Sequence, residues 1–273
     1  MTIRRSAVTS FGVAIAFSAL GVSACGLLFD VDSLGSTAAV DAGDAGSDAV
    51  AEVDAQCAHR AGGPMINAGG SCIDATKVTV LDYDAFRTAM RSAPPPPKPC
   101  DWLTSFEPPD FAKQLTSPNL PVVNVNWCQA FHYCAWAGKR LCGDVRGGAV
   151  AYDDAGMSDP KTNQWLRACT HEGERKFPWG NDSKGTACPE SPLVPVGSRP
   201  FCEGGYPGLF DMIGNGDEWV DGCDPAGRRG LPEEDDCPIV NAAVVRNEGK
   251  CSDYRYVGRY QADGYIGFRC CGP

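Results

Sequence analysis

The sequence predicts a loop-rich α+β domain with two main helices, short strands and disulfide bonds that hold the loops in place. Three observations support this class: only two segments carry a clear helical pattern, the chain contains 32 glycines and 21 prolines, and 15 cysteines are present. Frequent glycine and proline favour turns and ordered loops, and long loops in a compact domain need restraint from elsewhere. Residues 57–273 are enough for one sizeable core.

The first helix is expected to begin after Thr79. The Thr79 side chain can accept a hydrogen bond from the first turn, and Asp82 stands three residues later as its capping-box partner. Tyr83 and Phe86 then recur at helical spacing. Four consecutive prolines, Pro94–Pro97, exclude a continuation of the helix and start a loop.

The second helix is expected to begin after Asn126, which is a favourable N-cap residue. Four apolar residues then share one helical face: Trp127, Ala130, Phe131 and Cys134. Gly138 suits the left-handed C-terminal cap, and the cations that follow it, Lys139 and Arg140, are favoured by the helix dipole. Short apolar runs at Val122–Val125 and Ile266–Arg269 are expected to be strands.

Residues 1–24 have the features of a lipoprotein signal peptide. Two arginines precede an apolar run from Ala7 to Leu20, which is too short for a membrane-spanning anchor. The run ends in Val22-Ser23-Ala24-Cys25, which resembles a bacterial lipobox and implies that Cys25 becomes lipidated. The alternative is an ordinary signal peptide with an incidental cysteine. Lipid chains on Cys25 would anchor the protein to the cell envelope, and Gly26 after that cysteine favours the outer membrane.

Residues 25–56 form an acidic segment that is expected to be a disordered tether after the lipidated cysteine. The segment has seven acidic residues, no Lys or Arg and few large apolar residues, a composition that does not support a packed core. The whole chain has a net charge of −10, and no basic stripe is present. Nucleic acid is therefore excluded as a partner, and membrane contact is expected through the lipid anchor alone.

Fourteen cysteines lie between Cys57 and Cys271. An even number in a chain with an export signal predicts a disulfide framework. No C-x-x-C occurs, which argues against zinc ribbons and thioredoxin-like redox motifs. The residues alone do not fix the pairing.

Several segments, taken in their order along the chain, resemble one known family. They are SCIDATKVTVLDYDAF (Ser71–Phe86), PVVNVNWCQAFHYCAWAGKRL (Pro121–Leu141), FPWGN (Phe177–Asn181), GLFDMIGNGDEW (Gly208–Trp219) and GFRC (Gly267–Cys270). Their order and content resemble the formylglycine-generating enzyme, or sulfatase-modifying factor, family. The resemblance implies a C-type-lectin-like α+β fold in which two helices flank small twisted sheets. It also implies a disulfide between Cys134 and Cys270.

Active members of that family hold Cu(I) with two cysteines near the C-terminus, and the resemblance leaves this chain with one of them. One alignment places Cys251 at the second copper position and Arg246 at the first; another makes Cys251 the first and Tyr256 the second. A soft d¹⁰ ion needs two thiolates, so one ligand is missing either way. Cys169 stands where the family has a further bridging cysteine, whose partner position is Tyr256. The nearest replacement is Cys251, so a Cys169–Cys251 bridge is expected.

The resemblance also implies a calcium site in the segment Gly214–Trp219. The family binds Ca²⁺ here through an Asn side chain, a backbone carbonyl and a Glu carboxylate, which correspond to Asn215, Gly216 and Glu218. Such hard oxygen ligands suit Ca²⁺. Asp217 replaces the family's Trp and either adds a ligand or marks a loop with altered packing. The alternative is a solvated acidic loop.

Two function classes follow. The favoured one is a lipoprotein of the cell envelope whose domain is a non-catalytic, calcium-stabilised module that binds a peptide or glycan. The alternative is a copper-dependent oxidase of peptide cysteines in which Cys251 is catalytic. A purely structural envelope component is a third possibility. Free thiols discriminate between the first two, because an oxidase needs them and a fully bridged module has none.

Overall fold

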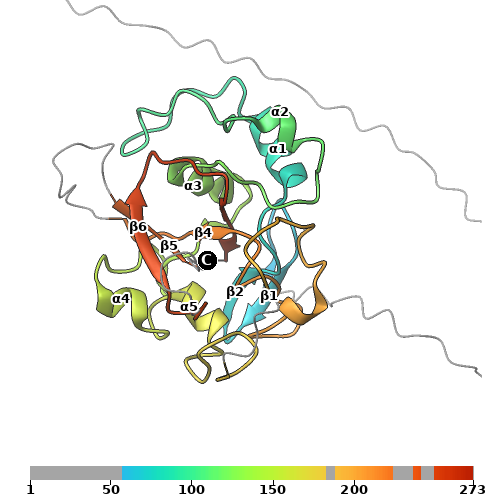
Figure 1. Cartoon of the computed structure of the whole chain (residues 1–273). Helices are drawn as coiled ribbons and strands as arrows, with labels where there is room; N and C mark the ends of the chain where they lie inside the picture. The colour runs from blue at the N-terminus through green and yellow to red at the C-terminus, as the bar shows by residue number, and fades with distance from the viewer. Residues whose placement is uncertain (1–56, 183–187, 224–235, 241–248, 273) are drawn as a thin grey trace, which may run out of the picture. The chain divides into compact units, whose positions relative to one another are not determined.

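The structure is a computed structural model that describes residues 57–182, 188–223, 236–240 and 249–272. The expected signal peptide, the tether with Cys25, and Arg246 lie outside these residues. No helix in the described part of the chain is long and apolar enough to cross a membrane. Residues 57–272 contain two small sheets and several short helices joined by loops (Figure 1).

The first sheet has four strands in the order β1-β2-β8-β3, and all neighbours are antiparallel. Its strands are β1 (Met65–Ala68), β2 (Ser71–Asp74), β8 (Cys270–Cys271) and β3 (Arg140–Leu141). The second sheet has the order β6-β5-β4-β7, with β4 and β7 parallel and the other pairs antiparallel. Its strands are β6 (Tyr254–Gly258), β5 (Asp236–Val240), β4 (Asp217–Trp219) and β7 (Ile266–Phe268).

One residue joins the two sheets. Strand β7 ends at Phe268 and β8 begins at Cys270, so Arg269 lies between them. The Arg269 side chain is fully buried. Its position therefore brings a guanidinium group into the interior, next to the strands of both sheets.

The two predicted helices are present with the predicted caps. Helix α1 spans Val80–Ala89, and the Thr79 side chain accepts a hydrogen bond from Asp82 N. Helix α3 spans Trp127–Trp136, and Asn126 forms a capping box with Gln129. Gly138 follows α3 with a φ of 76°, the left-handed conformation expected there.

Aromatic side chains pack α1 and α3 against the second sheet. The Tyr83 ring of α1 stacks on the Tyr133 ring of α3 at a centroid distance of 5.8 Å. Tyr133 in turn contacts Phe268 of β7 edge-on at 5.3 Å, and Phe86 contacts Tyr133 at 5.5 Å. All four residues have 0% exposure, so the family-like helices and the C-terminal strand share one core.

One expectation about local structure needs correction, and two details are new. Val122–Val125 is not a strand: the segment forms an isolated bridge at Pro121 and then bends at Asn124, whose φ is 58°. Lys139 follows the end of α3, as expected, and its side chain is buried against Asp74. Helix α5 (Gln164–Cys169), capped by Asn163, was not expected. The remaining helical segments are α2 (Phe111–Gln114), α4 (Asp154–Ser158) and η2 (Pro200–Cys202).

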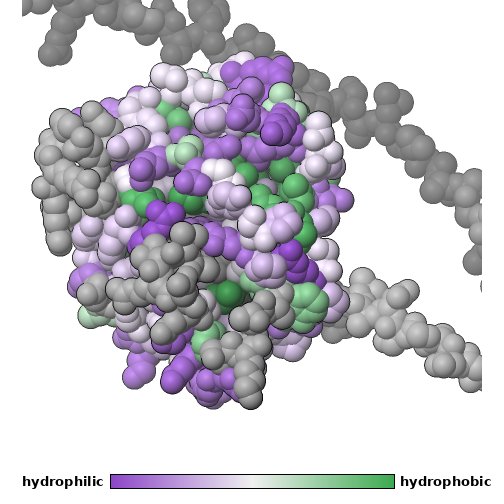
Figure 2. All heavy atoms as spheres, in the orientation of Figure 1, coloured by the Kyte–Doolittle hydropathy of each residue, from purple (hydrophilic) through white to green (hydrophobic). Residues whose placement is uncertain are grey.

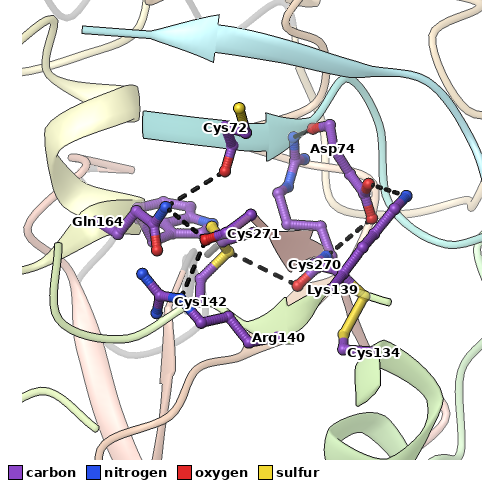
Figure 3. The surroundings of a disulfide bond; sticks show 12 residues. Cys72, Asp74, Cys134, Lys139, Arg140, Cys142, Gln164, Cys270 and Cys271 are labelled. Carbon is purple, nitrogen blue, oxygen red and sulfur yellow. Dashed lines mark hydrogen bonds and ion pairs between the residues drawn. A yellow bond between two sulfur atoms is a disulfide. The ribbon is translucent and has the colours of Figure 1, made fainter. Parts of the chain in front are cut away.

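All fourteen cysteines from Cys57 onward are paired. The bridges are Cys57–Cys72, Cys100–Cys128, Cys134–Cys270, Cys142–Cys271, Cys169–Cys251, Cys188–Cys202 and Cys223–Cys237. Strand β8 is held twice, by Cys134 of α3 and by Cys142 after β3 (Figure 3). The first of these joins residues 136 positions apart, and closing so long a loop stabilises the fold by about 4–5 kcal/mol in the chain-entropy description.

Candidate functional site

The cysteine that aligns with the copper ligands is in a disulfide. Cys251 is bonded to Cys169 of α5, with a Cα–Cα distance of 5.7 Å. The two residues have exposures of 1% and 0%. A bridged sulfur has no thiolate to coordinate Cu(I) or to attack a substrate. This pairing and Cys134–Cys270 are the two that were expected from the sequence.

The other aligned copper position that the structure describes carries no sulfur. Tyr256 lies in β6, partly buried, with its ring 4.4 Å from that of Tyr152 and 5.6 Å from that of Tyr254. A phenol in an aromatic cluster is a poor ligand for a soft ion. The described residues therefore offer neither of the two thiolates that the copper chemistry needs.

Glu218 of β4 lies at the centre of a buried cluster of charges and has 0% exposure. Its Oε1 atom lies 2.9 Å from Lys77 Nζ and accepts a hydrogen bond from Arg269 Nη2 at 2.9 Å. Its Oε2 atom accepts bonds from Arg269 Nε at 2.8 Å and Trp165 Nε1 at 2.9 Å. Burial alone would raise the pKa of Glu218, but Arg269 and then Lys77 outweigh burial and hold the pKa below its ordinary value.

Lys77 reaches this cluster from the segment between β2 and α1. Its Nζ atom donates to Asp211 O at 2.6 Å and to Gly214 O at 3.0 Å, besides contacting Glu218. The lysine is 1% exposed, and burial lowers its pKa. The segment from Asp211 to Glu218 therefore surrounds the Lys77 ammonium group, which has three oxygen partners.

The Asn215 side chain is also fully used within the protein. Its Oδ1 accepts a hydrogen bond from Val194 N at 2.9 Å. Its Nδ2 donates to Val194 O at 3.1 Å and to Asp211 Oδ2 at 3.3 Å. At Gly216, whose φ is 94°, a Cβ atom would lie 2.8 Å from Tyr265 O. The backbone here is thus fixed by close contacts with neighbouring segments.

These residues do not fit the calcium site predicted from sequence. Ca²⁺ takes six to eight oxygen ligands, yet Lys77 Nζ already lies 2.9 Å from Glu218 Oε1, and Asn215 Oδ1 accepts a hydrogen bond from Val194 N. Lys77 and Arg269 also place two positive charges against Glu218, which opposes binding of a further cation. Within the described residues, no group of three or more His, Cys, Asp or Glu side chains is arranged to hold a metal ion.

Asp217 faces a different environment, although it directly precedes Glu218. It is 1% exposed, and its Oδ2 accepts one hydrogen bond, from Arg255 Nη2 at 3.3 Å. Its Oδ1 is buried without a hydrogen-bond partner. Burial, and next the charge of Glu190, raise the pKa of Asp217 to about 7, although Arg255 opposes the change. Asp217 is therefore a carboxyl group that ionises near neutral pH.

A cavity of about 330 Å³ is lined in part by Arg255, the residue that donates a hydrogen bond to Asp217. Arg255, Tyr260, Gln261 and Asp263 supply its polar lining. A guanidinium, a phenol, an amide and a carboxylate around one cavity can recognise a polar ligand. Sequence reasoning missed this site, although the segment from Tyr254 to Tyr265 combines aromatic and charged residues at high density.

Comparison with known proteins identifies the family. A family model described as "Sulfatase-modifying factor enzyme 1-like domain" matches residues 33–271. The chain belongs to this family. Its fold is the α+β fold of formylglycine-generating enzymes, as the resemblance implied.

Among curated proteins of the family, this domain is similar to both active and inactive members. It is 27% identical over 205 residues to the formylglycine-generating enzyme of Bos taurus, a match that covers 64% of this chain and 49% of that protein. It is 31% identical over 166 residues to the inactive C-alpha-formylglycine-generating enzyme 2 of Mus musculus, with coverages of 55% and 48%. The chain thus spans about half the length of these curated relatives.

Two solved structures are also similar. The structure of CarF matches with a TM-score of 0.48 and 16% identity, covering 74% of this chain and 86% of that one. The structure of PvdO from Pseudomonas aeruginosa matches with a TM-score of 0.42 and 18% identity, with coverages of 74% and 79%.

Proposed function

We propose that this member of the sulfatase-modifying factor family is a non-catalytic binding module. The observation that carries the proposal is the buried disulfide between Cys251 and Cys169. Oxidation of a peptide cysteine through Cu(I) requires a pair of free thiolates, and every described cysteine is bridged. The likeness to relatives that are themselves described as inactive supports the same conclusion.

The ligand in this proposal is a peptide or a glycan that binds at the cavity beside β6. Arg255 and Asp263 offer charges of both signs there, while Tyr260 and the nearby Tyr265 are 48% and 46% exposed. On the face shown in Figure 2, apolar residues occur in small groups among polar ones. Half-exposed tyrosines beside charged groups suit polar ligands with flat apolar faces, such as sugar rings and peptide side chains.

A glycan and peptide array tests this ligand class. The wild-type domain should bind a subset of probes, and Tyr260→Ala should lose that binding. Phe201→Ala is the matched control, because Phe201 is an exposed aromatic residue that does not line the cavity. Equal loss in both variants, or no loss in Tyr260→Ala, would place the ligand elsewhere.

The non-catalytic assignment is tested by thiol titration. In a Cys25→Ser variant that is denatured without reductant, no free thiol should be found. The folded protein should neither take up Cu(I) nor consume oxygen with a cysteine-containing peptide. A free thiol at Cys251 that binds one equivalent of Cu(I), with oxygen consumed when the peptide is added, would instead establish the copper-dependent oxidase.

The proposed location is the cell envelope, with the domain outside the cytoplasm and a lipid on Cys25. Seven disulfides suit an oxidising compartment, and the lipobox-like segment supplies the anchor. The wild-type protein should sediment with membranes after expression in a bacterial host, in the outer-membrane fraction where the host has one. The Cys25→Ser variant should be released. A soluble wild-type protein would overturn the anchor.

A further inference from the structure

Three oxygen atoms from one loop surround the ammonium group of Lys77. They are the backbone oxygens of Asp211 and Gly214, at 2.6 and 3.0 Å, and Glu218 Oε1 at 2.9 Å. The Lys77 and Glu218 side chains both have 0% exposure. Two carbonyls and a carboxylate that converge on one buried point are the type of donor set that hard metal ions take in proteins.

We infer that the Lys77 ammonium is the built-in cation of this loop and fills the place of a bound metal ion. The loop, residues 211–218, then needs no Ca²⁺ to fold. Lys77 is separated from the oxygens it binds by more than 130 residues of sequence, so it joins the start of α1 to the loop as a shared metal ion would. This inference is independent of the proposed ligand-binding function.

The charges around the loop support a cation that is part of the protein. The two basic side chains Lys77 and Arg269 face two acidic side chains, Asp211 and Glu218, so this set already balances in formal charge. Ca²⁺ added to this set would leave excess positive charge in the interior, which is strongly unfavourable. We therefore expect that the stability of the wild-type protein does not depend on Ca²⁺.

The same oxygens should form a latent metal site once the ammonium group is removed. In Lys77→Ala the two carbonyls and Glu218 Oε1 would line a space left by the lysine side chain. The Asp211 side chain carries a further oxygen, Oδ1, which is buried and has no hydrogen-bond partner. Two carboxylates and two carbonyls are a reasonable start of a calcium coordination sphere, with waters completing it.

The test compares melting temperatures in millimolar calcium and in chelator. Wild-type protein should melt at the same temperature in both, and equilibrium dialysis should find no tightly bound Ca²⁺. Lys77→Ala should melt lower than wild type in chelator and should recover in part with calcium. At a calcium concentration roughly 100 times the Kd, the recovery should be about 5–10 °C for a domain of this size.

Lys139→Ala is the matched control. Lys139 is also a buried lysine, whose Nζ lies 2.5 Å from Asp74 Oδ1 and donates to Gly63 O at 3.0 Å (Figure 3). Only one carbonyl joins the carboxylate there, and Asp74 Oδ2 accepts from Cys270 N. This variant should be destabilised to the same extent with calcium and with chelator.

The wild-type result and the result for the two lysine variants can each overturn the inference. A calcium-dependent rise in the wild-type melting temperature would mean that the loop uses a metal in spite of Lys77. An equal response of Lys77→Ala and Lys139→Ala to calcium would mean that no latent site exists, and so would failure of Lys77→Ala to fold in both conditions. The wild-type titration decides metal independence even if that variant does not fold.

Discussion

Asp217 and Glu218 are adjacent carboxylates of β4, equally buried, yet their surroundings differ in kind. Successive side chains of a strand point to opposite faces. Glu218 meets Lys77 and Arg269, which lower its pKa, whereas Asp217 feels the negative charge of Glu190 and contacts one partly exposed cation, Arg255. The difference shows that burial alone does not set the protonation of a carboxyl group, because the neighbouring charges and hydrogen-bond donors also contribute.

The two carboxylates also differ in what they do for the fold. Glu218 receives four hydrogen-bonding or ionic contacts from three residues far apart in sequence. It therefore ties the start of α1, helix α5 and the junction of the two sheets together. The Asp217 side chain accepts a hydrogen bond from Arg255 at the edge of the second sheet, and Arg255 also lines the cavity where we place the ligand. One face of β4 thus carries a carboxylate that joins several segments, and the other carries a carboxyl group whose pKa is raised to about 7.

The largest expected effect comes from removing the Glu218 carboxylate. Glu218→Gln would leave Lys77 and Arg269 buried without their carboxylate, and removing one partner of a buried ionic cluster costs about 3–5 kcal/mol. Chemical denaturation of the protein with its disulfides intact measures this loss of stability. The control is Glu107→Gln, whose carboxylate is 55% exposed and pairs with Arg87; its cost should stay below about 1 kcal/mol. Similar losses in the two variants would refute the structural role of Glu218.

A smaller effect of opposite sign is expected from Asp217→Asn. The pKa of Asp217 is raised to about 7, against about 3.9 in an unfolded chain. Between pH 4 and pH 7 the folded protein binds more protons than the unfolded one. The free energy of unfolding therefore falls as the pH rises from about 4 to about 7. Asparagine does not ionise, so the variant should exceed wild type by about 2–3 kcal/mol above pH 8.

Melting curves from pH 4 to 9 check this prediction. The pKa of Asp221 is raised by burial to about 6, and that residue remains in the variant. The Asp217→Asn curve should therefore be flatter than the wild-type curve but still decline with pH. Parallel curves for the two proteins would mean that Asp217 titrates in the folded state much as it does in the unfolded chain.

Some features of this site could be predicted from sequence because their causes are local. The Thr79 cap bonds to a residue three positions away, and so does the Asn126 cap. Residue types at that spacing largely determine such bonds. The cap of α5 by Asn163 has the same local character, and its signal was present in the sequence but was overlooked.

The charge cluster could not be predicted in this way. Nothing near Lys77 in the sequence marks it as buried, because its partners Asp211 and Glu218 belong to a loop that only the folded chain brings close. The same holds for Lys139, whose position after a helix gives no sign of its pairing with the distant Asp74. The calcium site predicted from Asn215, Gly216 and Glu218 took no account of this lysine, which contacts Glu218 Oε1 at 2.9 Å.

The smallest effect concerns the ion pair between Asp217 and Arg255. Arg255→Met removes the cation that contacts Asp217 Oδ2 at 3.3 Å. Below pH 6 Asp217 is neutral and the substitution should cost little, while above pH 8 it should cost up to about 1 kcal/mol, because the Arg255 side chain is 33% exposed and solvent screens the pair. A double-mutant cycle with Asp217→Asn isolates the coupling between Asp217 and Arg255. The coupling energy should rise from near zero at pH 5 to its full value at pH 8. A coupling that is independent of pH would show that Asp217 is ionised throughout this range, and the contrast with Glu218 would then lie in the number of contacts alone.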